Sequence, residues 1–303
     1  MASSASMYCQ TVLSMRPTLT EVIEMSEHKK TYRHEWKYLV SYPEADLLFQ
    51  RLSPFLSLDK NAVNGEYMIR SLYFDDMHDS AYQKKIMGVD FRQKWRIRVY
   101  NCSDRRINLE RKTKNGSYIY KESANLTREE FQKILNGDYL FLLEKESNLC
   151  KEFYYECTAN LMRPKVIVDY ERTPLIMDAG TVRITFDKHV RAAIGSYDIF
   201  DAGLPTLPAI EPVKLVLEVK YTAFLPQVVK SLLPLNGQEF SAFSKYTECY
   251  EAAHHLTDPT AGITKTYLSR RKKKCLYGII LKRQYGNPSP PTAALPRISS
   301  LMQ

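Results

Sequence analysis

The chain has 303 residues, of which 44% are hydrophobic and 25% charged, a composition typical of a globular protein with a sizeable core. It has no run of eighteen apolar residues and no basic start followed by an apolar stretch, which excludes a membrane-spanning helix and a secretory signal. We therefore expect a soluble, cytoplasmic protein. The six cysteines lie far apart without a CxxC pair, which excludes a disulfide framework and a zinc site and predicts reduced thiols.

The formal net charge of +9 is concentrated near the C-terminus. Residues 257–303 carry nine lysines and arginines against a single acidic residue, Asp258. The rest of the chain is therefore close to neutral, and we predict no nucleic-acid partner for it. We expect residues 257–303 to form a basic, mostly disordered tail, which is either a solvated extension or a segment that attracts polyanions. Residues 1–29 are expected to be an unstructured leader, and Met25 is an alternative start of translation.

From Tyr32 onward, apolar and polar residues alternate in short runs rich in Val, Ile, Tyr and Phe, as in β-strands. The dipeptide Asn115-Gly116 predicts a hairpin turn between two of these runs. Eight strands are predicted, at residues 31–40, 67–74, 91–100, 105–112, 117–123, 164–173, 181–187 and 213–222.

Helical stretches separate some of the strands. Thr127 and Glu130 form a capping box, which predicts the start of one helix. Strands joined mostly by short loops, with helices between only some of them, predict an α+β fold over residues 30–256: an eight-stranded antiparallel β-barrel, closed or nearly closed, with helices packed on the outside. The six helices are expected at residues 43–56, 79–87, 127–135, 145–160, 225–233 and 244–255.

Charged residues recur two positions apart in nearly every predicted strand, so they share one face of the sheet. Arg96 and Arg98 form one such pair, and Glu218 and Lys220 form another. In a single strand this pattern is typical of a solvent-exposed face. In all the strands together it indicates the barrel interior, because the helices need the apolar face to cover. A basic interior that is left empty is very unfavourable, so it predicts a bound polyanion together with a metal ion.

Phosphate chains fit such an interior best. Arginine offers a planar fork to phosphate oxygens, lysine a point charge, and carboxylates hold Mg²⁺ or Mn²⁺ that also contacts the phosphates. The chain contains neither a GxxxxGK[ST] loop nor a GxGxxG loop. The phosphates are therefore expected to be bound by strand side chains.

Eight short segments in series resemble the VTC domain, the polyphosphate polymerase branch of the triphosphate tunnel metalloenzymes. Their order and spacing match from about residue 31 to about residue 250. The resemblance implies a tunnel that transfers the γ-phosphoryl group of ATP to a polyphosphate chain and releases ADP, with Mn²⁺ or Mg²⁺ as cofactor. The segments are YRHEWKYLV, SLYFDD, RQKWRIRVY, NLERKTKNGSYIYKES, VDYERTPL, VRITFD, LVLEVKY and FSKYTE.

The resemblance also assigns roles by position. ATP and polyphosphate are the implied partners, and the membrane coupling of eukaryotic relatives would need a partner protein that this chain does not identify. The metal is assigned to Glu218. Catalytic roles are assigned to Arg96, Arg98, Lys112 and Arg172. Phosphate binding is assigned to Lys37, Lys121, Arg183, Lys220 and Lys245.

One departure from the superfamily pattern favours the polymerase branch. Hydrolases and cyclases of the superfamily begin with ExExK, whereas here Arg33 replaces the first glutamate ahead of Glu35 and Lys37. Two alternatives stay open. One is an inorganic triphosphatase or tripolyphosphatase that activates water with Glu35 or Glu110, and the other is a non-catalytic module that binds polyphosphate or inositol phosphates. A further pair, Asp75-Asp76, either caps the next helix or braces an arginine of the interior.

Overall fold

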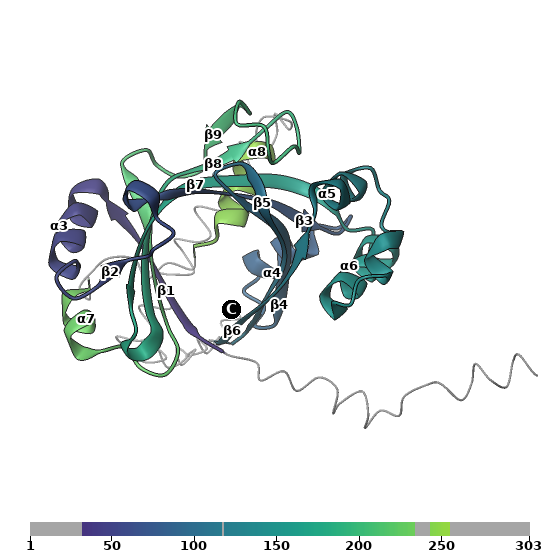
Figure 1. Ribbon diagram of the computed structural model, residues 1–303. Helices are drawn as coiled ribbons and strands as arrows, with labels where there is room; N and C mark the ends of the chain where they lie inside the picture. The colour runs from purple at the N-terminus through teal and green to yellow at the C-terminus, as the bar shows by residue number, and fades with distance from the viewer. Residues whose placement is uncertain (1–31, 117, 234–242, 255–303) are drawn as a thin grey trace, which may run out of the picture. The chain divides into compact units, whose positions relative to one another are not determined.

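The computed structural model describes residues 32–116, 118–233 and 243–254. The predicted leader and basic tail lie outside these residues. All eight predicted strands are present and form one antiparallel sheet in the order β1-β10-β8-β7-β3-β4-β5-β6 (Figure 1). Their bounds are β1 (His34–Ser41), β3 (Tyr67–Asp75), β4 (Arg92–Tyr100), β5 (Ser103–Asn115), β6 (Tyr118–Leu126), β7 (Arg163–Met177), β8 (Val182–Ala193) and β10 (Lys214–Tyr221).

The sheet curls until its two edges meet. Arg33, just before β1, forms a backbone bridge with Ile119 of β6, with N···O distances of 3.2 and 3.3 Å. Figure 1 shows the strands as a ring seen from one end. The prediction of a closed or nearly closed antiparallel barrel is therefore confirmed.

Several strands differ in length from the prediction, and two short ones were not predicted. Strands β5, β7 and β8 run several residues further because residues beyond their predicted ends still pair with neighbouring strands. Strands β2 (Ser57–Leu58) and β9 (Thr206–Pro208) pair with β7 and β8 but are too short to show an alternating pattern. In the predicted hairpin, Asn115 still pairs with Tyr118, so the turn lies one residue later than expected.

All six predicted helices are present, with small shifts at their ends. The first ends at Leu52, two residues before Pro54, and the fourth begins at Asn148 after a separate 3₁₀ turn, η2 (Leu140–Leu143). The capping box of Thr127 and Glu130 is confirmed. None of the helices within the described ranges is long and apolar enough to cross a membrane. The helices are α3 (Tyr42–Leu52), α4 (Ser80–Ile86), α5 (Arg128–Leu135), α6 (Asn148–Ala159), α7 (Gln227–Leu232) and α8 (Lys245–His254).

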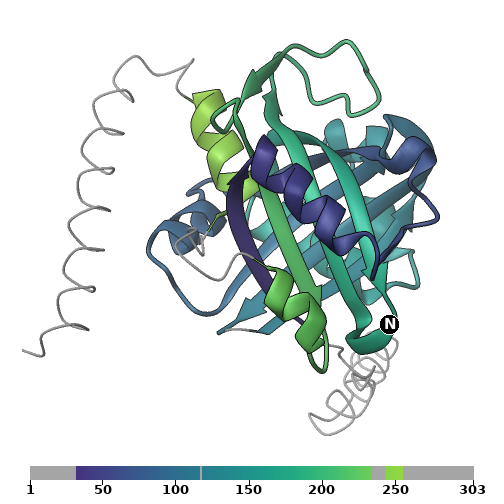
Figure 2. The ribbon, with the colours of Figure 1, turned by 90° about the vertical axis from the view of Figure 1, so that its left-hand side faces the viewer.

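Two apolar clusters fill the space between the outer face of the sheet and the helices. On one side, Trp95 and Ile97 of β4 pack with Phe131 of α5 and Phe153 of α6. The second cluster joins α3 and α7 to the outer face of β1, β8 and β10, and Figure 2 shows α3 lying across these strands. The apolar face of the sheet therefore points outward, and the alternating charged residues point into the barrel.

Helix α8 is the exception, because it packs against inward-facing positions of the sheet. Its Tyr246 belongs to an apolar cluster with Val168 of β7 and Val216 of β10, which share the inward face with Tyr170 and Glu218. This places the start of α8 at the barrel interior. The alternation pattern predicted all helices on the outside, although the family resemblance had already assigned Lys245 of this helix to phosphate binding.

Asp75 anchors two helices at this end of the barrel. Its carboxylate accepts hydrogen bonds from the backbone N–H groups of Ala81 and Tyr82 in the first turn of α4, at 2.9 and 3.0 Å. It also accepts one from the Tyr246 hydroxyl of α8, at 2.7 Å. Of the two roles left open for Asp75, capping the following helix is therefore confirmed.

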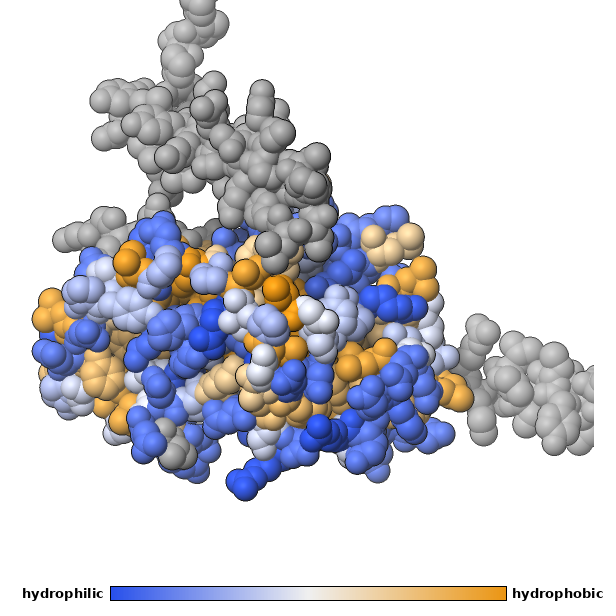
Figure 3. Space-filling model, turned by 90° about the horizontal axis from the view of Figure 1, so that it is seen from above, coloured by the Kyte–Doolittle hydropathy of each residue, from blue (hydrophilic) through white to orange (hydrophobic). Residues whose placement is uncertain are grey.

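The view in Figure 3 shows a largely hydrophilic outer face with hydrophobic residues in scattered patches.

Candidate active site

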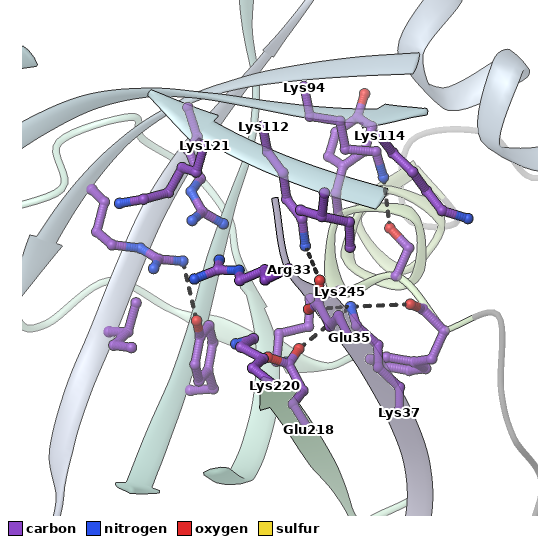
Figure 4. Close-up of a pocket in the computed structure, with 18 of the residues that line it drawn as sticks. Arg33, Glu35, Lys37, Lys94, Lys112, Lys114, Lys121, Glu218, Lys220 and Lys245 are labelled. Atoms are coloured by element: carbon purple, nitrogen blue, oxygen red, sulfur yellow. Dashed lines mark hydrogen bonds and ion pairs between the residues drawn. The ribbon is translucent and has the colours of Figure 1, made fainter. Parts of the chain in front are cut away.

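The barrel interior holds a cavity of about 680 Å³ that is strongly basic. Fourteen lysines and arginines line it, against two glutamates, Glu35 and Glu218. Most of these side chains come from inward-facing positions of the strands, while Lys245 comes from α8 and Lys85 from α4. Figure 4 shows several of them. A site with this excess of positive charge is suited to an anion with many charged oxygens.

All ten residues assigned from the sequence lie at this cavity. Seven strands and one helix contribute them, so the fold brings together positions that are far apart in the chain. The residues are Lys37, Arg96, Arg98, Lys112, Lys121, Arg172, Arg183, Glu218, Lys220 and Lys245. Their individual roles remain proposals.

The carboxylate of Glu218 contacts four cationic side chains. Its carboxylate accepts hydrogen bonds from Lys220 at 2.5 Å and from Lys245 at 2.8 Å. The side-chain nitrogens of Lys37 and Arg172 each lie 3.4 Å from it. Burial alone would raise the pKa of Glu218, but these four cations hold it well below its ordinary value. Glu218 therefore stays ionised and organises the lysines around it.

Asp187 holds two of the four cations that surround Glu218. It is fully buried and accepts two hydrogen bonds from Arg172, at 2.7 and 2.8 Å. The Nζ atom of Lys245 lies 2.6 Å from Oδ2 of Asp187, which is also one of the two oxygens that Arg172 contacts. The planar guanidinium of Arg172 is thus fixed by a two-point contact, and Lys245 is shared between Asp187 and Glu218.

Glu110 organises a second cluster, on β4 to β6. It accepts hydrogen bonds from Arg96 at 2.8 Å and from Lys121 at 2.6 Å, and the guanidinium of Arg98 lies 4.0 Å away. Tyrosine hydroxyls bind the other side of both arginines: Tyr73 at 2.9 Å from Arg96 and Tyr170 at 3.1 Å from Arg98. The two arginines are therefore held in place before any ligand arrives.

Glu35 and Asp59 hold two more of the assigned cations. Glu35, whose side chain is almost wholly buried, accepts a hydrogen bond from Lys112 at 2.6 Å and lies 3.5 Å from Lys37. Burial would raise the pKa of Glu35, yet Lys112 and Lys37 lower it well below its ordinary value. Arg183, assigned from the resemblance, lies 2.7 Å from Asp59.

The sequence interpretation missed several cations of the cavity. Arg92 and Lys94 precede Arg96 at the same period of two, and Lys114 follows Lys112 in the same way, so strand alternation alone would have indicated them. Lys85 lies on α4, where no strand pattern applies. The missed cations of the lining are Lys85, Arg92, Lys94 and Lys114; Arg33, noted in the sequence as the departure from ExExK, also lies there.

The fit of a divalent metal can be judged from the carboxylates. Within the described part of the chain, no three acidic, histidine or cysteine side chains gather as a metal site. Glu218 could serve as one ligand, with phosphate oxygens supplying most of the others, which is how Mg²⁺ is commonly bound. The site therefore fits a metal that arrives with a phosphate chain.

A curled antiparallel barrel whose interior is lined by many cations and a few carboxylates defines a protein of the triphosphate tunnel class. The model of the VTC domain family matches residues 32–254, so the chain belongs to the VTC domain family. The family predicted from the eight segments is confirmed. Among curated proteins, none matches the chain in sequence.

Solved structures with a similar fold are distant in sequence. One is a candidate adenylyl cyclase from Hippeastrum, described as having a dominant triphosphatase activity. It is 14% identical, the match covers 74% of this chain and 96% of that one, and the TM-score is 0.45. Another is a candidate adenylate cyclase from Bacillus halodurans, 10% identical, with coverage of 67% and 86% and a TM-score of 0.42.

Proposed function

We propose that the protein is a polyphosphate polymerase that transfers the γ-phosphoryl group of ATP to a polyphosphate chain and releases ADP. The family supports a phosphoryl-transfer role in general. The observation that carries the specific proposal is the state of the interior carboxylates. Glu35, Glu110 and Glu218 each hold at least two cations within 4.0 Å.

A carboxylate held in this way is a poor general base. The cations lower the pKa of Glu35 and Glu218 well below the ordinary value, and the pKa of Glu110 is lowered as well, by Arg96 above all, although burial opposes it. A general base works best with a pKa near the operating pH. Hydrolysis would need such a base to activate water, whereas the terminal oxygen of a polyphosphate chain is already anionic. The interior therefore favours polyphosphate as the nucleophile.

The reaction forms one bond and breaks another. A terminal oxygen of the chain bonds to the γ-phosphorus of ATP, the bond from that phosphorus to the β,γ-bridging oxygen breaks, and ADP leaves with the electron pair. In this proposal Arg96 and Arg98 neutralise the transferred group, because both guanidinium groups are oriented by hydrogen bonds to the protein before a ligand arrives. Lys112 and Arg172 complete the charge stabilisation, and catalysis rests on positioning and electrostatics.

The remaining cations would hold the other phosphates in line. Lys37, Lys121, Arg183, Lys220 and Lys245 are the proposed phosphate-binding residues. Mn²⁺ or Mg²⁺ held by Glu218, when bound, would neutralise further charge on the phosphate oxygens. ATP and polyphosphate are the proposed partners, and nucleic acid is not expected.

The test follows the products. The protein is incubated with ATP, Mn²⁺ and a short polyphosphate primer, and ADP, free phosphate and chain length are measured. We expect one ADP to be released for each phosphate unit added to the chain, with little free phosphate. Free phosphate without chain growth would show a triphosphatase, and tight binding without turnover would show a binding module. Arg96→Gln should lose chain growth, whereas Lys230→Gln, on α7 outside the barrel, should keep it.

A further inference from the structure

The cations of the cavity differ in whether a carboxylate balances them. The nine assigned lysines and arginines all have one within 4.0 Å. By contrast, no carboxylate in the described ranges lies that close to Arg92, Lys94 or Lys114, three cavity-lining residues on adjacent strands. We call these three residues the β4–β5 basic cluster. Asp90 acts on Arg92 and Lys114 only from beyond ion-pair distance, so no ion pair within the described ranges balances the cluster.

The pairing of the strands makes this cluster unfavourable in the absence of a ligand. Arg92 of β4 lies directly opposite Lys114 of β5, and Lys94 lies opposite Lys112. Lys112 in turn lies opposite Lys121 of β6. Like charges at directly opposed positions destabilise a sheet. A row of such pairs that is retained inside a cavity indicates an anion that binds there.

The environment of Lys94 agrees with this geometry. Burial, followed by the positive charges of Lys37, Lys85 and Lys112, lowers the pKa of Lys94 well below its ordinary value. Its ammonium group donates a hydrogen bond to the Ser244 hydroxyl, at 2.7 Å. Lys94 therefore connects the cluster to the start of α8, next to the phosphate-binding residues.

Figure 4 shows where two members of the cluster, Lys94 and Lys114, lie in the lining of the cavity. Lys94 and Lys114 lie toward one side of the lining, Lys121 lies toward the other with Lys112 between them, and Glu35 and Glu218 lie below these lysines in this view. Lys114 projects beyond Lys94, away from Glu218. An anion held by the balanced cations around Glu218 and Glu110 would reach this side of the lining only if it were long.

We propose that the β4–β5 basic cluster is a separate subsite, which binds the part of a polyphosphate chain that extends beyond the triphosphate-binding residues. The identity of the ligand rests on the proposed function. Ligand phosphates at this subsite supply the close counterions that the described residues do not provide. The subsite therefore gives the protein a preference for long chains over tripolyphosphate.

The experiment compares chain lengths in binding alone, without ATP or metal. Dissociation constants for tripolyphosphate and for long-chain polyphosphate are measured by calorimetry at several salt concentrations. The test variant is Arg92→Gln/Lys114→Gln. The control is Lys133→Gln/Lys230→Gln, which removes the same charge from α5 and α7 outside the barrel. Thermal melting confirms that both variants are folded, and single-stranded RNA serves as a second polyanion.

We expect the test variant to bind long-chain polyphosphate about tenfold more weakly or worse, and to bind tripolyphosphate within about twofold of the wild type. Loss of two phosphate contacts should also reduce the salt dependence, lowering the slope of log K against log salt by about 1.5. The control variant and RNA binding should change little. An equal loss for both chain lengths, an equal loss in the control, or a loss confined to RNA would overturn the proposal.

The same measurements separate this inference from the proposed function. A wild-type protein that hydrolyses ATP without extending chains would refute the polymerase. If that protein still bound long chains more tightly than tripolyphosphate through Arg92 and Lys114, the subsite would stand. If the wild type bound both chain lengths equally, the subsite would be refuted whatever the activity.

Discussion

At the scale of single residues, Glu218 has two roles, and the substitution Glu218→Gln allows each to be measured separately. It balances four cations, and it is the proposed metal ligand. We expect Glu218→Gln to lose metal-dependent turnover, because Gln keeps the shape but not the charge. Without metal, the variant should bind tripolyphosphate as tightly as the wild type or more tightly, since the cavity becomes more positive. Turnover and metal-free calorimetry measure the two effects. Wild-type turnover with Mn²⁺ would contradict the assignment.

Removing Glu218 should also lower stability in the absence of a ligand. Four cations would be left without their shared carboxylate, and breaking a buried ion pair on one side typically costs about 3–5 kcal/mol. Added phosphate should reverse part of the decrease in melting temperature, because it supplies the missing negative charge. A variant that melts like the wild type with and without phosphate would contradict this role.

Lys112 predicts how binding depends on pH. Burial and nearby Lys37 lower its pKa to about 8, although Glu35 opposes the shift. Below pH 8 the group is charged, so metal-free affinity for tripolyphosphate should fall as the pH rises through about 8. Calorimetry across pH 6.5–9.5 measures this. In Lys112→Arg the step near pH 8 should vanish because a guanidinium does not titrate there. A step that survives in Lys112→Arg belongs to another group.

The lowered pKa of Lys112 affects stability in the opposite direction to binding. An unfolded lysine keeps its proton up to about pH 10.4, whereas folded Lys112 loses it near 8. Between these values the unfolded state binds more protons, so the Lys112 contribution makes the protein more stable as the pH rises. Denaturant unfolding of wild type and Lys112→Gln across this range should differ in slope. Parallel curves would show that Lys112 titrates normally in the fold.

At the scale of elements, a row of tyrosine–carboxylate hydrogen bonds attaches α8 to α4 and to the end of β3. Tyr246 donates to Asp75 at 2.7 Å, Tyr250 to Asp79 at 2.6 Å, and Tyr82 of α4 to Glu251 at 3.1 Å. Tyr246 follows Lys245 directly in sequence. The attachment of α8 therefore sets the position of a proposed phosphate-binding lysine.

We expect Tyr246→Phe to destabilise the fold by about 1.5–3 kcal/mol, since buried Asp75 loses a hydrogen bond to its charged form. Because Lys245 becomes less well placed, KM for ATP should rise more than kcat falls. Denaturant unfolding and steady-state kinetics test the two parts. Tyr82→Phe, which leaves Asp75 paired, is the control and should change KM little. An unchanged KM in Tyr246→Phe would show that α8 does not position Lys245.

At the scale of the whole molecule, the basic segment outside the described residues should act only on long ligands. Removing residues 257–303 takes away most of the net charge of +9, but none of the described residues that line the cavity. Affinity for tripolyphosphate should hardly change, because exposed charges are screened beyond about 10 Å at 0.1 M salt. Long-chain polyphosphate should bind more weakly and with less salt dependence. Loss of tripolyphosphate binding in a cooperatively melting truncated protein would contradict a site inside the barrel.

The sequence determined the strands, the helices and the inward position of the charged face. Alternation with a period of two assigns every strand residue to one face, and only one face can be covered by helices. Trp95 and Ile97 therefore had to point outward and Arg96 and Arg98 inward. The family segments then selected ten residues, all of which lie at the cavity.

Only the tertiary structure decided which charges balance each other. Whether a carboxylate reaches Arg96 but not Lys94 depends on the register between β4 and β5, where Arg96 faces Glu110 and Lys94 faces Lys112. The inward packing of α8 is likewise decided by contacts between distant segments. Local sequence carries the period of a strand but not its register with a neighbour, because the register is set by the packing of the whole barrel.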